Sequence, residues 1–114
     1  MIDKYESGHL IRIDGRDYHH DVKIIDGRVK GDWWRREGHR LDSRDITDIL
    51  EMHPEVLVIG TGYAEQMRVP ESTREAIASH GIQMKVEKTD HAVRTFNHLL
   101  KEGRVVAGAF HLTC

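Results

Sequence analysis

The stretch VLVIGTGY, residues 56–63, decides the fold. Its first four residues are apolar and mostly β-branched, which is typical of a strand covered on both faces, as in a parallel sheet. Gly60-Thr61-Gly62 then predicts a tight turn. A helix beginning near Pro70 and ending at Gly81 leads to a second strand, Ile82–Val86. Such a strand–helix–strand segment is a right-handed parallel crossover in nearly all known cases.

Further helices and a strand flank this crossover. Thr89-Asp90 offers a cap for a helix that runs to Lys101. Upstream, Asp42-Ser43 offers a cap for a shorter helix, which must end before Pro54. The apolar run Val105–Leu112 is expected to be a central strand. This second part of the chain therefore predicts an α/β arrangement.

The N-terminal third carries the pattern of antiparallel strands. Apolar and polar residues alternate from His9 to Asp14, and an extended pattern resumes from Tyr18 to Ile25. Asp14-Gly15 and Asp26-Gly27 supply two turns at strand-like spacing, because Asp-Gly is favoured in tight hairpins. We therefore expect an antiparallel meander that continues through Arg28–Trp34 and joins a mixed sheet.

Composition limits the chain to one modest core. The 114 residues are 39% hydrophobic, so we expect a single domain over residues 1–114. The 17 basic and 19 acidic residues give a formal charge of -2, which argues against a dedicated nucleic-acid binder. The longest charge-free run is about half of the roughly 20 residues that a membrane-spanning helix needs, and the single cysteine favours a reducing compartment. We therefore expect a cytoplasmic protein that binds neither nucleic acid nor a membrane.

A series of short motifs resembles one protein family. The motifs are Val58-Ile59-Gly60-Thr61-Gly62-Tyr63, Met67, Val69-Pro70-Glu71, Gly81-Ile82, Thr89, Ala92, Phe96-Asn97, Leu99, Glu102-Gly103-Arg104 and His111-Leu112-Thr113-Cys114. In this order they are similar to the Mth938-like (DUF498) domain. The resemblance implies a three-layer α/β domain with a mixed central sheet, an N-terminal β-hairpin or meander and about three helices. It implies no settled activity, no catalytic set and no cofactor, although one branch is linked to assembly of respiratory complex I.

The loop after the first buried strand is a candidate ligand site. Ligands gather at the carboxyl ends of strands in open α/β sheets, where loop N–H groups favour anions. The site would comprise Gly60, Thr61, Gly62, Tyr63, Met67, Thr89 and Asn97. The alternative is structural: the glycines permit close backbone approach, Thr89 caps a helix, and the Asn97 amide hydrogen-bonds the backbone of the Gly60 loop.

The arginine-rich segment around two tryptophans is a candidate partner surface. Acidic residues are interleaved with its arginines, so it carries little net charge and is a weak candidate for nucleic acid. Trp and Arg are enriched in interface hot spots. We therefore expect Trp33, Trp34 and Arg36 to contact a protein partner. The alternative is a solvated hairpin end with one tryptophan packed on the core.

Histidine and cysteine residues form no recognisable metal or nucleophile pattern. Cys114 follows His111 by three residues, and positions three apart on a strand face opposite sides of a sheet. No third group is evident to orient His111. His19-His20 are adjacent, while His91 and His98 share one side of a helix without a third ligand. We therefore expect no metal site and no catalytic residues.

These observations predict a non-catalytic accessory domain, resembling an assembly factor, that binds a protein partner or a small anionic ligand. The alternative is a small-molecule-binding protein or enzyme with its site at the Gly60–Tyr63 loop. An exposed hairpin edge favours a homodimer, whereas edge charges such as Lys30 and Asp32 oppose one. Both oligomeric states stay open at this point.

Overall fold

The large sheet is mixed, and its last strand lies at its centre. The computed structural model describes residues 1–114 and orders this sheet β5-β4-β8-β6-β7. Its strands are β4 (Val22–Ile25), β5 (Arg28–Lys30), β6 (Val56–Thr61), β7 (Gln83–Glu87) and β8 (Val106–His111). β6 pairs in parallel with both β7 and β8, while β4 runs antiparallel to β8. The predicted crossover and central strand are confirmed.

A separate three-stranded sheet holds the N-terminus. It consists of β1 (Ile2–Glu6), β2 (Leu10–Ile13) and β3 (Arg16–Tyr18), paired antiparallel in that order. Both Asp-Gly turns are present, with positive φ at each residue of Asp14-Gly15 and Asp26-Gly27. The expectation of one continuous meander is wrong, because the chain leaves the small sheet after Tyr18 and enters the large sheet at Val22. Asp21 lies at this junction.

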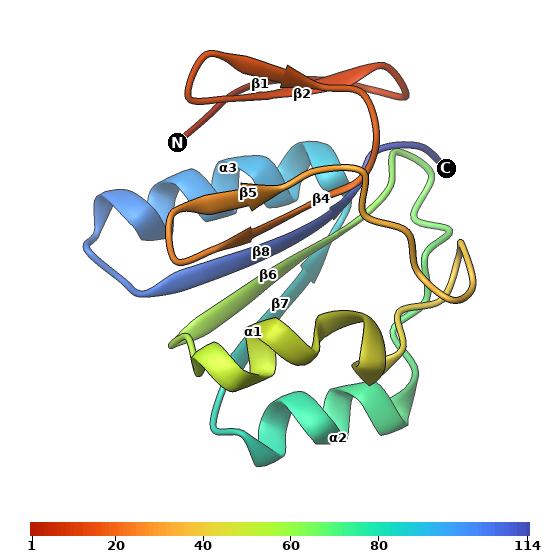
Figure 1. Ribbon diagram of the computed structural model, residues 1–114, viewed down its shortest axis with the longest axis vertical. Helices are drawn as coiled ribbons and strands as arrows, with labels where there is room; N and C mark the ends of the chain where they lie inside the picture. The colour runs from red at the N-terminus through yellow and green to blue at the C-terminus, as the bar shows by residue number, and fades with distance from the viewer.

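Helices cover both faces of the large sheet. They are the 3-10 helix η1 (Ser43–Ile46) and the α-helices α1 (Thr47–Met52), α2 (Glu71–Ser79) and α3 (Thr89–Lys101). α3 and the small sheet lie on one side, whereas α1 and α2 lie on the other (Figure 1). Asp42 caps η1 as predicted, but the N-cap of α3 is Lys88, so Thr89 is not the cap. None of these helices has the length and apolar character needed to cross a membrane.

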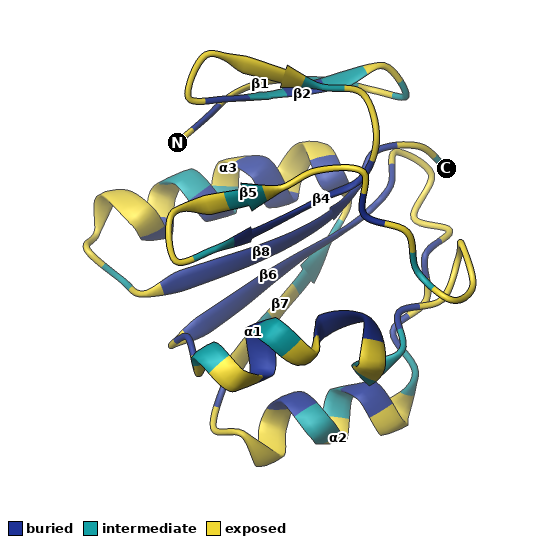
Figure 2. Cartoon of the chain, viewed as in Figure 1, coloured by how far each residue is buried: buried dark blue, intermediate teal, exposed yellow.

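The core is divided by the sheet into two apolar clusters. Along β6, Val56 and Val58 face the cluster beneath α3, whereas Leu57 and Ile59 face the cluster beneath α1 and α2. β6 and β8 are buried along their whole length (Figure 2). Each fully buried aliphatic side chain of this kind contributes about 1.5–3 kcal/mol. Burial of β6 and β8 therefore contributes much of the stability of the fold, and it keeps the carboxyl ends of these two strands in place.

Candidate functional site

The Gly60–Tyr63 loop is occupied by the chain itself. Gly62 has a φ of +100°, and a Cβ built there would lie 2.1 Å from the Thr113 carbonyl oxygen. The Gln66 N–H donates to the Cys114 carbonyl oxygen at 2.9 Å. The glycine therefore allows Leu112–Cys114, which we call the C-terminal segment, to pack directly on the loop.

Thr89 connects this loop to β8. Its hydroxyl accepts a hydrogen bond from the Gly62 N–H at 2.8 Å and donates to the His111 carbonyl oxygen at 2.6 Å. A Cβ on Gly60 would come within 2.8 Å of the same hydroxyl. Because the Gly62 donor is already paired inside the fold, it is not free to bind an anion. The structural interpretation of these glycines is the one the geometry supports.

The remaining residues of the expected ligand site are dispersed. Met67 is buried and its N–H donates to the Thr61 carbonyl oxygen, whereas Tyr63 is exposed. Asn97 lies elsewhere, where its side chain donates to the Ile2 carbonyl oxygen at 2.7 Å and accepts from the Ile2 N–H at 2.8 Å. Its role is structural, but the expectation that it binds the Gly60 loop is wrong. It ties α3 to β1 instead.

Asp21, Arg35 and His111 form a buried polar group, here called the Asp21 cluster. Asp21 Oδ2 lies 2.7 Å from both His111 Nδ1 and Arg35 Nη1, and Asp21 Oδ1 accepts from the Leu112 N–H at 2.7 Å. Burial opposes ionisation of Asp21, but the hydrogen bonds from His111 and Leu112 and the charge of Arg35 outweigh it, so the pKa of Asp21 is lowered. An ionised Asp21 only accepts hydrogen bonds, so His111 Nδ1 carries the hydrogen between them.

Arg35 extends the Asp21 cluster into the following loop. Its guanidinium donates to the Gly38 carbonyl oxygen at 2.6 Å and lies 4.9 Å from the centre of the Trp33 ring. Arg35 Nη2 is also 3.0 Å from His111 Nδ1, a close contact rather than a hydrogen bond because that nitrogen donates to Asp21. These contacts hold Trp33, Arg35 and Gly38 in place within residues 31–44, here called the arginine loop.

His39 and Cys114 lie beside the Asp21 cluster. His39, His111 and Cys114 each offer a ligating atom, and these atoms all lie within 4.8 Å of one another. The expectation that His111 and Cys114 face opposite ways is wrong, because β8 ends at His111 and the C-terminal segment then turns over Gly62. Asp21 supplies the orienting group that sequence spacing did not reveal.

The two tryptophans of the arginine loop have opposite environments. Trp33 is buried in the core cluster beneath α1 and α2, whereas Trp34 is 70% exposed and contacts His20. The expectation that Trp33 contacts a partner is therefore wrong, and the alternative of one tryptophan packed on the core is confirmed. Arg36 is exposed, and its N–H donates to Asp45 Oδ1 at 3.1 Å.

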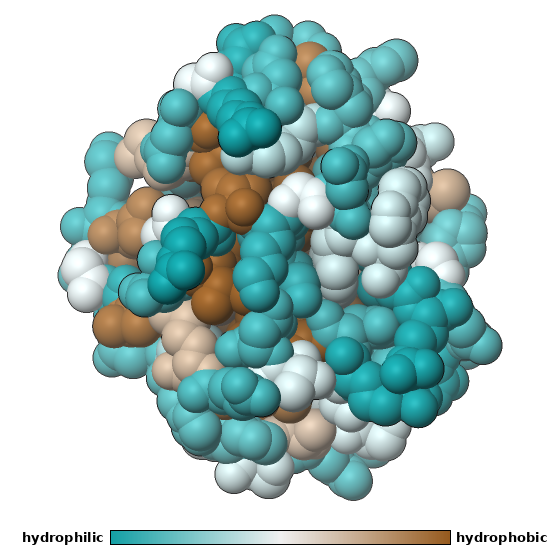
Figure 3. Space-filling model, viewed as in Figure 1, coloured by the Kyte–Doolittle hydropathy of each residue, from teal (hydrophilic) through white to brown (hydrophobic).

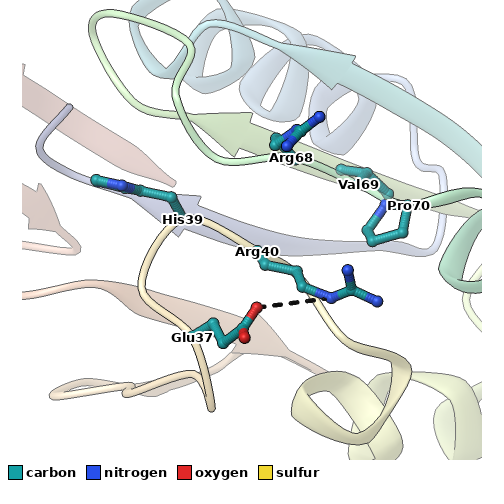
Figure 4. Close-up of a pocket in the computed structure, with 6 residues that line it drawn as sticks. All are labelled: Glu37, His39, Arg40, Arg68, Val69 and Pro70. Atoms are coloured by element: carbon teal, nitrogen blue, oxygen red, sulfur yellow. Dashed lines mark ion pairs between the residues drawn. The ribbon is translucent and has the colours of Figure 1, made fainter.

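A hollow of about 530 Å³ opens beside the arginine loop. Its lining is Glu37, His39, Arg40, Arg68, Val69 and Pro70 (Figure 4). Arg40 lies 3.8 Å from Glu37, while Arg68 makes no ion pair. The side of the molecule that carries this loop is coloured mainly teal and white, that is, hydrophilic to neutral (Figure 3). The hollow thus has two guanidinium groups and one carboxylate.

The mixed sheet, the small N-terminal sheet and the arrangement of helices define a class of α/β protein known from solved structures. A protein from Bartonella henselae described as an outer membrane protein is 33% identical with a TM-score of 0.85, over 99% of this chain and 94% of that one. A Mth938-like domain from Bordetella pertussis shares the fold, with a TM-score of 0.63 and 22% identity over 98% of this chain and 85% of that one. The family profile described as "Protein of unknown function (DUF498/DUF598)" matches residues 2–111, and the chain belongs to this family.

Curated relatives carry a functional name. The human protein "NADH dehydrogenase [ubiquinone] 1 alpha subcomplex assembly factor 3" is 37% identical over 68 residues, which are 60% of this chain and 36% of that protein. Its namesake from Danio rerio is 38% identical over 69 residues, 60% of this chain and 39% of that protein. The match thus spans little more than a third of the length of these relatives.

Proposed function

We propose that this chain is a non-catalytic, assembly-factor-like accessory protein that acts by binding a protein partner through the arginine loop. The names of its curated relatives support this class of function. The observation that carries the proposal is Trp34, a large aromatic side chain that is 70% exposed between anchored neighbours. The chain would work as one domain over residues 1–114, and its single cysteine supports a reducing compartment such as the cytoplasm.

Trp34 is held in place on both sides. The preceding Trp33 is buried and its N–H donates to the Asp21 carbonyl oxygen at 2.9 Å. The following Arg35 is paired with Asp21, and the Arg36 N–H is paired with Asp45. A side chain presented from such a rigid backbone loses little conformational entropy on binding. Trp34 therefore has the properties of an interface hot spot.

The unpaired arginines of the arginine loop and of the adjoining hollow favour an acidic partner segment. Arg36 and Arg68 are exposed and make no ion pair, whereas Arg40 and Arg44 are paired with Glu37 and Asp42. The free guanidinium groups favour carboxylates, which they bind in a bidentate manner. We infer that the partner places an aromatic or aliphatic contact on Trp34 and a carboxylate in the hollow beside Arg68.

The test is quantitative affinity purification of binding partners from extracts of the source organism. Three forms of the chain serve as bait: the wild type, Trp34→Ala/Arg36→Glu, and the control Arg94→Glu on α3. We expect one protein to be reduced at least tenfold with the double variant and unchanged with the control. That protein, once purified, must bind the wild-type chain directly in calorimetry. Direct binding that survives the double variant would overturn the assignment of this surface, and self-association alone would replace the partner with a second copy of the chain.

A further inference from the structure

We propose that His39, His111 and Cys114 form a binding site for a transition-metal ion, with Zn²⁺ the ion that the donors suit best. Two imidazoles and one thiolate are typical zinc ligands. The three ligating atoms already lie within 4.8 Å of one another. In a tetrahedral zinc site, bonds of about 2.0–2.3 Å place neighbouring ligand atoms about 3.3–3.6 Å apart. The site therefore closes through an adjustment of about 1 Å, which the exposed His39 side chain is free to make.

His111 is the ligand with the clearest structural support, because its ring nitrogen Nε2 has no hydrogen-bond partner. The side chain is only 6% exposed, its Nδ1 donates to Asp21, and its Nε2 is buried without a hydrogen bond. A buried polar atom without a partner requires an explanation. With the hydrogen on Nδ1, the neutral ring presents a lone pair at Nε2, the form that binds a metal. Metal-bound histidines usually donate their other N–H to a carboxylate, as His111 does to Asp21.

The other two ligands are positioned by backbone contacts. The His39 carbonyl oxygen accepts from the Arg68 N–H at 2.8 Å, and its ring points away from Glu37 and Arg40 (Figure 4). The His39 and His111 rings meet edge to face with centres 5.7 Å apart. Cys114 is half-buried, and its carbonyl oxygen is held by the Gln66 N–H. Two segments distant in sequence, the arginine loop and the end of the chain, thus bring the three donors to the same point.

The same residues resemble a thiol nucleophile with its base, but the geometry points to a metal. A cysteine nucleophile of the acyl-transfer kind needs donors that stabilise an oxyanion. The nearby Gly62 N–H is already bound by Thr89. His39 has no part in a Cys–His–Asp arrangement, whereas it completes a three-ligand metal site. Three protein ligands leave a fourth position for water or for a group of another molecule.

The test is Co²⁺ binding to the untagged full chain after chelator treatment, because Co²⁺ occupies zinc sites and reports its ligands optically. We expect one equivalent to produce a thiolate-to-cobalt charge-transfer band and the intense visible bands of tetrahedral Co²⁺. One equivalent of Zn²⁺ should remove both signals. Calorimetry should then give one Zn²⁺ per chain.

The variants avoid the buried core and therefore keep the fold. Cys114→Ser should abolish the charge-transfer band, and His39→Gln should weaken Zn²⁺ binding at least tenfold. The control His91→Gln removes an exposed histidine of α3 and should change neither signal. The proposal is overturned if the wild type shows no thiolate band, if His39→Gln binds Zn²⁺ like the wild type, or if Zn²⁺ fails to slow alkylation of Cys114.

Discussion

The Gly60–Tyr63 loop and the arginine loop were both candidate binding sites, but they differ in how far their groups are already paired or covered within the fold. In the first, Gly62 pairs with Thr89 and is covered by the C-terminal segment. In the second, the side chains of Trp34 and Arg36 are exposed to solvent. The neighbouring Arg35 is anchored to Asp21, and the Arg36 N–H is anchored to Asp45. A glycine motif after a buried strand thus serves packing here. The binding surface that we propose lies instead where the side chains of Trp34 and Arg36 are exposed to solvent.

The largest effect should come from the contacts that support the arginine loop. Asp21→Ala leaves Arg35 and His111 without their buried carboxylate, and removing one partner of a buried ion pair costs about 3–5 kcal/mol. Urea unfolding measures this loss. The control Asp17→Ala removes a carboxylate that forms an exposed ion pair with Arg12, and it should unfold close to the wild type. Equal effects of the two substitutions would show that the Asp21 cluster does not support the fold.

Stability should depend on pH through Asp21. Because its folded-state pKa is lowered, its contribution is present above the unfolded-state value of about 3.9 and is lost as pH falls through the folded-state pKa. In Asp21→Asn, unfolding free energy should therefore fall less steeply on acidification than in the wild type. Some acid dependence should persist, because Asp42 and Asp48 also have lowered pKa values. Parallel pH curves for the two proteins would contradict this assignment.

The two adjacent tryptophans give the sharpest internal comparison. Trp33→Ala empties a buried site and should cost about 3–5 kcal/mol. Trp34→Ala removes an exposed side chain and should change stability by no more than about 0.5 kcal/mol. Thermal and urea unfolding of both variants measure the difference. A large loss with Trp34→Ala would mean that this residue belongs to the fold rather than to a binding surface.

The packing role of the Gly60–Tyr63 loop predicts a smaller but clear loss. In Gly62→Ala, the positive φ alone should cost about 1–3 kcal/mol, and the new methyl group would displace the C-terminal segment. Gly38→Ala is the matched control, because a Cβ there meets no atom within 4 Å. Calorimetric unfolding compares the two. If Gly62→Ala is as stable as Gly38→Ala, the segment does not pack on the loop as described.

Asn97 should have the smallest effect among the structural residues. Asn97→Ala removes two hydrogen bonds to Ile2, which together are worth about 1–2 kcal/mol. Amide exchange should accelerate in β1 and remain unchanged in β6. Exchange that accelerates in the Gly60–Tyr63 loop instead would support the contact originally expected for this side chain.

Local signals explain what the sequence could predict. The β6–β7 crossover and both Asp-Gly hairpins follow from periodicity and turn chemistry that lie within a few residues of each other. The Asp21 cluster has no such signal, because Asp21 and His111 are 90 positions apart and meet only when β4 pairs with β8. The same holds for Cys114, whose direction depends on a turn over Gly62 rather than on strand alternation. The different environments of Trp33 and Trp34 also have no local signal, because they depend on the packing of Trp33 into the core cluster beneath α1 and α2.

The most direct test of the contrast between the two loops is a proton–nitrogen NMR titration of the wild-type chain with a short glutamate-rich peptide containing one aromatic residue. We expect shifts at the Trp34 indole and at the amides of Arg36, Arg40 and Arg68, with the Gly60 and Gly62 amides unchanged. Shifts confined to Gly60–Tyr63 would contradict the account, because they would place an open anion site in the loop that the C-terminal segment is described as filling.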